Sequence, residues 1–455
     1  MVIGLRTKLR VMTFALLMSA SSFILAPAPN AQTGSQSESI NVNPKLPVIP
    51  TRKFLITDFG AVGDGQHSNT ASFRQAILAC RDAGGGQVMV PAGTFVTGPF
   101  ELAANMALVL QKGAIIRAAE NVSAYDTADH KVLPLIGGRR LTNVAILGEG
   151  TIDGAGAPWW KRFRAERAAG VPQQGQPRQA GQPQESPRPK LVLLTDCANV
   201  LIRGVTIKDA PQFHLVPQRC HDVTIEDVTI TAPADSPNTD GIDPSSSHDV
   251  LIRHCTIDVG DDNVAFKSNP GEGATENVLV TDCIFKHGHG ASVGSNIGGG
   301  IRNIVVQNCT FDGADNGIRI KSARDRGGLV ENVTYRHIAM KNVGVAITLN
   351  LFYFDKTAQQ ERKTAAVTST TPVVRGIRII DVVVEGAKTA GDIVGLPEMP
   401  IDTVTLENVR VNANTGMTVQ DARNVSLRNV RITPQKGDPW KIVSAEVNEV
   451  QNRER

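Results

Sequence analysis

Apolar and polar residues alternate in a short phrase that recurs along most of the chain. In the copy NVLIRGVTI, which begins at Asn199, apolar side chains fall at offsets 0, +2, +5 and +7 from the second residue. Such alternation is typical of half-buried strands, so each copy predicts two short strands. The second residue of each copy lies at position 200, 223, 250, 278, 304, 333, 377, 404 or 425.

Neither strand of a copy can bury its apolar face alone, so the copies are expected to stack into one coil with a continuous core. Most spacings between successive copies lie between 21 and 29 residues, and one is 44. Three strands with their turns fill such a spacing, which predicts an all-β fold, a parallel β-helix. A propeller is the alternative, but its blades need about 40–45 residues.

The cysteines follow the repeat. Cys255, Cys283 and Cys309 stand at offset +5, where other copies have valine, so they are predicted to be small core residues with free thiols. Cys197 and Cys220 also align with each other. Their distance allows a bridge, but side chains in parallel register point the same way, which favours free thiols.

Three segments depart from the repeat. Residues 68–86 place Phe73, Ala76, Ile77 and Cys80 on one helical face, which predicts a short helix that caps the open end of the coil. Exposed loop insertions are predicted at about 161–190, which is rich in Pro, Gln and Gly after 165, and at 355–372.

The chain begins with a basic, then apolar, then small-residue segment that predicts a signal peptide over residues 1–31. We therefore expect an exported protein, periplasmic or secreted. A polar linker over 32–53, a β-helix catalytic domain over 54–435 and a C-terminal tail over 436–455 complete the predicted organisation.

Net charge excludes one class of partner. The formal charge is +3, and the predicted signal peptide contains three basic and no acidic side chains, so the mature chain is close to neutral. A neutral chain predicts no nucleic-acid partner. After signal removal no other segment could span a bilayer, and a monomer is expected.

Acidic and basic residues are predicted to share one face of the coil. Adjacent rungs of a parallel coil lie roughly 4.8 Å apart, so residues one period apart in sequence stack. Asp240 and Asp261 are 21 residues apart, and Asp262 and His289 are 27 apart. The predicted stripe contains Asp240, Asp261, Asp262, Lys267, His289, Arg319 and Lys321.

Such a stripe suits hydrolysis of a glycosidic bond. Neighbouring carboxylates raise one another's pKa, so one can keep a proton while another activates water. Carboxyl groups one or two rungs apart would match the spacing of about 6.5–9.5 Å found in inverting enzymes. Arginine binds a carboxylate through two parallel hydrogen bonds, so an anionic polymer such as a polyuronate is the expected substrate.

Four motifs on this stripe make the pattern specific: NTD (238–240), GDD (260–262), GHG (288–290) and RIK (319–321). In order and spacing they resemble those of the polygalacturonase family, glycoside hydrolase family 28, and the resemblance extends over about 54–435. It implies a right-handed, single-stranded parallel β-helix of the pectin-lyase type. The implied activity is inverting hydrolysis of α-1,4-galacturonosidic bonds in pectin, a plant cell-wall polymer.

The resemblance also implies catalytic roles. Asp261 would be the general acid, Asp240 and Asp262 would hold and activate the water, and His289 would support the ionisation of the acid. No metal or cofactor is required by this mechanism.

The same resemblance implies substrate contacts. Arg319 and Lys321 would bind the galacturonate carboxylate, and Asn238 and Tyr353 would contact the sugar. Lys267, on the same face, is expected to contact the substrate too. Where many relatives have Glu, this chain has Asn296, which changes the expected detail of sugar binding.

Two other interpretations of these residues stay open. Asp261 and Asp262 could bind Ca²⁺, as in a calcium-dependent pectate lyase, but the nearby basic residues oppose this. A non-catalytic β-helical polysaccharide-binding protein is the other alternative. Asp243 is interpreted as a turn residue.

The remaining polar and aromatic candidates are interpreted as structural. Exposed turn or surface positions are predicted for His221, His248, His254 and His287. Packing is favoured over sugar stacking for Trp159 and Trp160. Side-chain bonds to turn backbone are predicted for Asn199, Asn277, Asn303 and Asn332.

The pattern leaves the mode of cleavage and the pectic substrate open. One hypothesis is that the loop over 165–190 closes one end of the groove and favours exo cleavage. Homogalacturonan, xylogalacturonan and rhamnogalacturonan all stay possible substrates.

Overall fold

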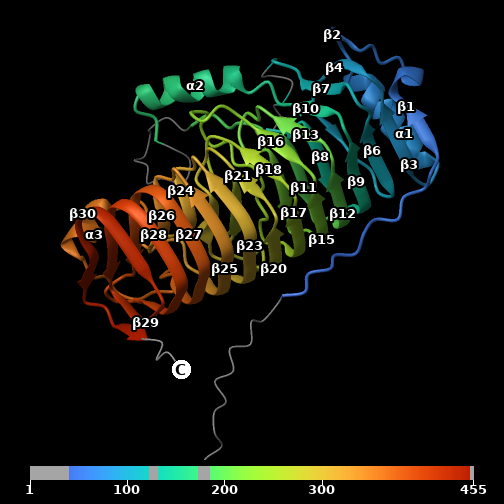
Figure 1. The fold of residues 1–455 in the computed structure, drawn as a ribbon. Helices are drawn as coiled ribbons and strands as arrows, with labels where there is room; N and C mark the ends of the chain where they lie inside the picture. The colour runs from blue at the N-terminus through green and yellow to red at the C-terminus, as the bar shows by residue number, and fades with distance from the viewer. Residues whose placement is uncertain (1–39, 122–124, 126–131, 173–184, 451–455) are drawn as a thin grey trace, which may run out of the picture. The chain divides into compact units, whose positions relative to one another are not determined.

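The protein folds as a coil in which each turn contributes strands to parallel ladders (Figure 1). The computed structural model describes residues 40–121, 125, 132–172 and 185–450. The predicted signal peptide and the last five residues of the predicted tail lie outside them. No helix among the described residues combines the length and the apolar character that crossing a membrane requires.

The first ladder is built from the first strand of each sequence repeat. Val200 pairs with Val223, and Val250 pairs in turn with Val223 and Val278, so the copies stack in the predicted register. Its shorter strands are β1 (Lys53–Leu55), β3 (Gly86–Val90), β6 (Met106–Leu110), β9 (Thr142–Gly148), β12 (Ala198–Arg203), β15 (His221–Glu226), β17 (His248–Arg253), β20 (Thr275–Thr281), β29 (Ala422–Arg428) and β31 (Val447–Val450).

The second ladder is built from the second strand of each repeat. Its shorter strands are β2 (Asp64–Ser68), β4 (Gly93–Thr97), β7 (Ala114–Ala118), β10 (Thr151–Asp153), β13 (Thr206–Lys208), β16 (Thr229–Thr231), β18 (Thr256–Asp258) and β21 (Ile284–Phe285).

The third ladder carries the acidic stripe. Single bridges at Ile242 and Ser245 join its first four strands to the rest. Its shorter strands are β5 (Phe100–Glu101), β8 (Ile136–Arg139), β11 (Val192–Thr195), β14 (Leu215–Gln218), β19 (Val264–Ser268), β22 (Ala291–Ile297), β24 (Asn316–Lys321) and β26 (Val345–Asn350).

Toward the C-terminus, single long strands take part in more than one ladder. They are β23 (Ile301–Asp312), β25 (Leu329–Lys341), β27 (Val373–Val394), β28 (Ile401–Gln420) and β30 (Arg431–Val443). Because β30 and β31 still pair with this coil, the stack continues past the predicted domain boundary at residue 435.

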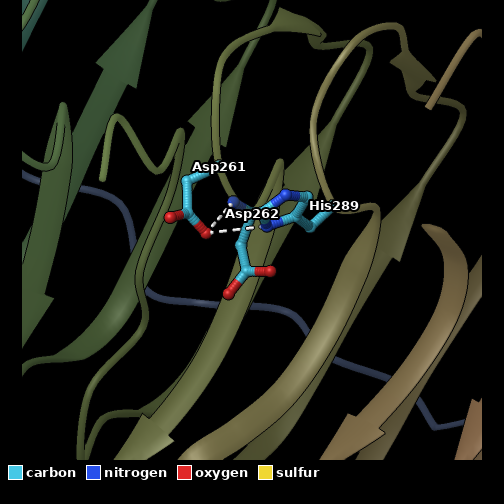
Figure 2. A group of neighbouring side chains, drawn as sticks. All are labelled: Asp261, Asp262 and His289. Atoms are coloured by element: carbon cyan, nitrogen blue, oxygen red, sulfur yellow. Dashed lines mark hydrogen bonds and ion pairs between the residues drawn. The ribbon is translucent and has the colours of Figure 1, made fainter. Parts of the chain in front are cut away.

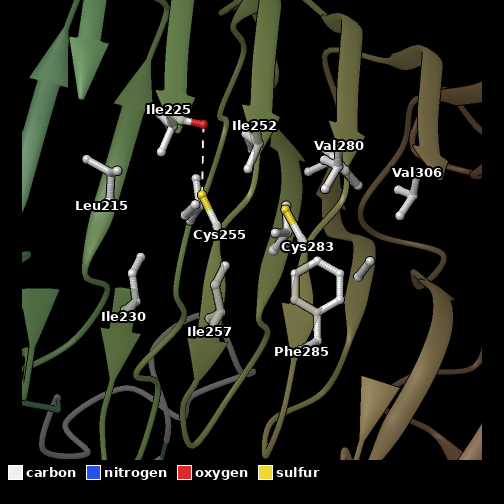
Figure 3. Close-up of a cluster of buried hydrophobic side chains, with 14 of the residues drawn as sticks. Leu215, Ile225, Ile230, Ile252, Cys255, Ile257, Val280, Cys283, Phe285 and Val306 are labelled. Atoms are coloured by element: carbon white, nitrogen blue, oxygen red, sulfur yellow. Dashed lines mark hydrogen bonds between the residues drawn. The ribbon is translucent and has the colours of Figure 1, made fainter. Parts of the chain in front are cut away.

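The interior is a column of small and branched apolar side chains (Figure 3). Cys255 and Cys283 lie in it on adjacent turns, between Ile252 and Ile257 on one turn and Val280 and Phe285 on the next. Every cysteine of the described residues is buried and free, Cys197 and Cys220 included. The predicted free thiols are confirmed.

A helix covers the N-terminal end of the coil, as predicted. It is α1 (Thr70–Asp82), preceded by a short 3-10 turn, η1 (Ile56–Phe59). Its buried face includes Phe73, whose ring stacks on Phe100 of the third ladder at a centroid distance of 4.8 Å.

Asparagines at the start of the repeats form a ladder of their own. The Asn199 amide donates to the Asn143 side chain at 3.0 Å, and Asn303 donates likewise to Asn277 at 3.2 Å. Several of these residues have a positive φ, Asn199 at 53° among them. Their side chains therefore bond to one another up the stack, whereas the sequence predicted bonds to turn backbone.

The two insertions are more ordered than predicted. The first begins with helix α2 (Ala157–Ala168), and at its other end Glu185 and Arg188 are buried. Residues 173–184 of the predicted loop lie outside the described ones. The second insertion contains helix α3 (Lys356–Glu361) in an otherwise mostly exposed segment.

Residues 40–52, predicted as part of a linker, run extended along the coil (Figure 1). The backbone N–H of Lys45 donates to Asp222 Oδ1 at 2.8 Å, and that of Val48 donates to Asn143 Oδ1 at 3.4 Å. This segment is therefore packed on the first ladder.

Candidate active site

Four predicted residues gather where the chain enters successive strands of the third ladder. Asp240 precedes the bridge at Ile242, Asp261 and Asp262 precede β19, and His289 precedes β22. Figure 2 shows Asp261, Asp262 and His289 as one group, with Asp261 joined to His289 and to the backbone of Asp262. One ligand atom of each lies within 4.8 Å of the others.

The backbone around His289 is close to its neighbours. A Cβ on Gly288 would lie 2.5 Å from the Asp261 carbonyl oxygen, and one on Gly290 would lie 2.1 Å from the Gly317 carbonyl oxygen. Gly290 also has a φ of +73°. Glycines on both sides of His289 therefore let its turn stack tightly on the neighbouring turns.

Asp262 is held by cations from two rungs away. Its Oδ2 accepts from Lys321 Nζ at 2.7 Å, and its Oδ1 accepts from Arg319 Nη1 at 3.1 Å and from Ser292 Oγ at 2.7 Å. Burial alone would raise the pKa of Asp262, but the charges of Lys321 and Arg319 outweigh it and lower that pKa. Asp262 is therefore held as a carboxylate.

Asp240 and Asp243 share one lysine. Lys267 Nζ donates to Oδ2 of each at 2.6 Å. Burial raises the pKa of Asp243 to about 6 and that of Asp240 well above its ordinary value, against the opposing charge of Lys267. Asp243 is thus a buried ion-pair partner, which corrects its interpretation as a plain turn residue.

Asp261 is the most exposed of the three predicted acids. Its side chain is 20% exposed, against 4% for Asp240 and 1% for Asp262. It contacts His289 Nδ1 at 3.0 Å, and its Oδ1 accepts from the Asp262 backbone N–H at 2.9 Å. Burial opposes its ionisation, but the hydrogen bond and charge of His289 outweigh burial and lower the pKa of Asp261.

Asn238 links this acid to a residue that the sequence did not single out. Its amide donates to Asp261 Oδ2 at 3.3 Å, and its Oδ1 accepts from Arg188 Nη2 at 2.7 Å. Arg188 is buried, contacts Glu185 Oε1 at 3.2 Å and lies over the Phe163 ring at 4.2 Å. The insertion is rich in Pro, Gln and Gly and has no periodicity, so no pattern in the sequence pointed to this contact.

His214 is a second residue that the sequence did not single out. It is fully buried, with Nδ1 2.9 Å from the Asp240 carbonyl oxygen and Nε2 3.2 Å from the Ala210 N–H. The Ala210 N–H must donate, so Nε2 accepts and Nδ1 carries the proton. Burial lowers the pKa of His214 to about 4. This neutral imidazole supports the backbone of Asp240.

Tyr353 lies beside the basic pair. Its ring centroid is 5.4 Å from Arg319 Cζ and 5.2 Å from Lys321 Nζ. Asn296, by contrast, accepts a hydrogen bond from Arg326. Arg319, Lys321 and Tyr353 thus form the C-terminal side of the site.

The basic residues argue against a calcium site. Asp261, Asp262 and His289 could each offer one ligand atom. However, both carboxylate oxygens of Asp262 accept hydrogen bonds from Arg319 or Lys321, and Lys267 Nζ donates a hydrogen bond to Asp240. Calcium binds through several carboxylate oxygens, which here would have to release ammonium and guanidinium partners. The residues present do not fit Ca²⁺.

The residues interpreted as structural are so placed. Trp159 and Trp160 are buried, and the Trp160 indole donates to the Ala210 carbonyl at 3.0 Å. Exposed side chains are found at His221, His248, His254 and His287.

Comparison with known proteins is consistent with this arrangement. A probable polygalacturonase of Vitis vinifera is 32% identical over 382 residues, which cover 78% of this chain and 74% of its own. An endo-polygalacturonase of Pectobacterium carotovorum is 31% identical over 63% of this chain and 73% of its own. The exopolygalacturonase structure from Thermotoga maritima superposes with a TM-score of 0.75 at 29% identity, over 86% of this chain and 94% of that one.

The predicted right-handed parallel β-helix is confirmed by these likenesses. The sequence profile of glycosyl hydrolases family 28 matches residues 80–434, which include all four motifs of the stripe. The chain therefore belongs to family 28 of the glycosyl hydrolases.

Proposed function

We propose that this glycosidase hydrolyses α-1,4 bonds between galacturonate residues of polygalacturonate, with inversion. One observation supports it most. Asp240, Asp261 and Asp262 lie together on one face, and Lys267, Arg319 and Lys321 lie among them. Carboxylates supply acid and base catalysis for a glycosidic bond, and the cations favour a polyanionic substrate.

Asp261 is proposed as the general acid because it is the most accessible of the three carboxyl groups. In the free site its pKa is lowered by His289 and then by Lys321. A galacturonate carboxylate bound at Arg319 and Lys321 would neutralise part of that charge. The pKa of Asp261 would then rise, which allows it to carry the proton that the leaving oxygen needs.

Asp240 and Asp262 are proposed to hold the attacking water. The Oδ1 atom of Asp240 accepts no hydrogen bond from the described residues, so it can accept one from a water. Asp262 is kept ionised by Arg319 and Lys321. A water between these two groups would be oriented and partly deprotonated as it attacks.

Substrate contacts are proposed for Asn238, Arg319, Lys321 and Tyr353. Arg319 uses one terminal nitrogen on Asp262, so its other donors can bind a sugar carboxylate. Lys267 is revised from a substrate contact to a positioning residue, because its ammonium group already joins Asp240 and Asp243.

We also propose that the protein is exported. The pattern of residues 1–31 supports export to the periplasm or the medium.

Exo cleavage is a further part of the proposal. The insertion reaches the site through the contact of Arg188 with Asn238, which supports closure of one end of the substrate-binding groove. Chromatography of early products tests this, because a ladder of oligomers would show endo cleavage.

Incubation with purified polygalacturonate tests the activity. New reducing ends without an unsaturated product are expected, and proton NMR of the first product should show the inverted anomer. An unsaturated, calcium-dependent product would instead identify a lyase. Binding without any product would identify a polysaccharide-binding protein.

A further inference from the structure

One basic residue of the groove has no role in the proposed chemistry. Lys190 ends the described part of the first insertion, immediately before β11. In the third ladder, Val192 pairs with Leu215, and Leu215 pairs with Ile242. Two residues earlier in each strand, the same register aligns Lys190 with Phe213 and Phe213 with Asp240. The backbone of Lys190 therefore lies two rungs from that of Asp240, roughly 10 Å away along the third ladder.

The Phe213 ring joins Lys190 to the catalytic group. Lys267 Nζ lies 4.0 Å from the ring centroid and Lys190 Nζ lies 5.9 Å from it. Aromatic faces attract cations over such distances. The ring thus contacts the ammonium group that binds Asp240 and lies near the second one, on Lys190.

Lys190 differs from the other cations of this face in its pairing. Lys267, Arg319 and Lys321 each contact a carboxylate. Lys190 is half-buried, and its ammonium group forms no ion pair or hydrogen bond with the described residues. Burial lowers its pKa, against the attraction of Asp243. A partly desolvated cation without a partner is strongly stabilised by an incoming anion.

The segment that presents Lys190 is firmly held. Two residues earlier, Arg188 donates to the Pro237 carbonyl at 2.8 Å and to the Asn238 side chain at 2.7 Å. The N–H of Leu191 donates to the Phe213 carbonyl at 2.9 Å. Lys190 is therefore fixed in place on both sides, as a binding residue should be.

We propose that Lys190 and Phe213 form an additional subsite of the groove. Its ligand is the carboxylate of a galacturonate residue on the N-terminal side of the sugar bound at Asp261, with the sugar ring beside Phe213. This inference rests on the proposed function and extends it, because it makes binding depend on the length of the substrate.

Galacturonate oligomers of increasing length test the subsite. The Asp261→Asn variant is used for calorimetric binding, alone and combined with Lys190→Met, from digalacturonate to hexagalacturonate. Once an oligomer is long enough to reach Lys190, the loss of one charge-assisted bond should weaken its binding about tenfold. Still longer oligomers should show the same tenfold loss. Lys112→Met, which removes an exposed lysine of a distant turn, should change nothing.

Two results would overturn the proposal. Equal weakening at every length would mean that Lys190 acts only through its long-range charge, and no weakening at any length would mean that it does not bind substrate. Lys190→Arg should restore binding, and Lys190→Gln replaces Lys190→Met if that variant fails to fold. Turnover of polygalacturonate by the wild-type chain, measured first, separates failure of the proposed function from failure of the subsite.

Discussion

Two columns of side chains run along the same stack of coils and differ in how they use it. The interior column repeats almost the same residue at each turn. Cys255, Cys283 and Cys309 occupy equivalent positions and are all buried. Other turns have valine there, such as Val228 and Val382.

The outer column changes at every rung. From Lys190 it continues through Phe213, Asp240 and Asp262 to His289. The same stacking of turns aligns both columns, through the third ladder for these residues and through the first two ladders for the cysteines. The coil thus supplies equivalent positions, and the chemistry arises where one face departs from the repeat.

The largest effect is expected on the outer face, at Asp261→Asn. An amide cannot donate the proton that the leaving group needs, so turnover should fall by about 10²–10⁴-fold. The variant should keep the native fold, since the amide is isosteric, and should lose only the stability supplied by the charged contact with His289. Initial rates of reducing-end release measure this, with Asp282→Asn on an exposed turn as the matched control. Full activity in the variant would mean that another residue is the acid.

Lys267→Met should destabilise the outer column itself. It leaves Asp240 and Asp243 buried without their shared cation. Removing one partner from a buried pair costs about 3–5 kcal/mol. The loss should shrink at lower pH, where both carboxyl groups take up protons. Urea unfolding at several pH values measures it, and unchanged stability at neutral pH would contradict the ion-pair account.

His214 should give the chain a distinct pH dependence. Its pKa is about 4 in the folded chain and 6.5 ordinarily, so the unfolded chain binds the proton first as pH falls. Stability should therefore decrease by about 3 kcal/mol between these two pH values. His214→Gln should remove this component, whereas the exposed His287→Gln should not. Identical pH profiles for wild type and His214→Gln would refute it.

The smallest effect is expected inside the coil, at Cys283→Val. Valine adds one methyl-sized group, and such additions to a packed core cost about 1–3 kcal/mol. Because valine already occupies the equivalent position in other turns, we expect a cost at the low end of this range. Activity should be unchanged, because the side chain points away from the groove. Loss of several kcal/mol on chemical unfolding would show that the interior column is not interchangeable.

The repeat is sufficient to predict the coil, the register of its first ladder and a candidate catalytic set. Alternation fixes which side chains are buried, and a one-residue slip would expose them all, so Val200, Val223 and Val250 had to stack. Stacking also predicted that Asp262 aligns with His289, as the structure shows. It predicted Asp240 beside Asp261, whereas the bridge between Ile242 and Val264 aligns Asp240 with Asp262, one residue further on. The length of the coil was underestimated, because β30 and β31 continue it past residue 435, beyond the last copy of the repeat.

Tertiary structure alone decided which charges pair and which do not. The fate of Asp243 depends on the Lys267 side chain, and Arg188 and Lys190 reach the groove from an insertion without any periodicity. Periodicity reports only which face a residue occupies. Ion pairing and burial of a polar group depend on distances between segments far apart in sequence, and no local pattern records them.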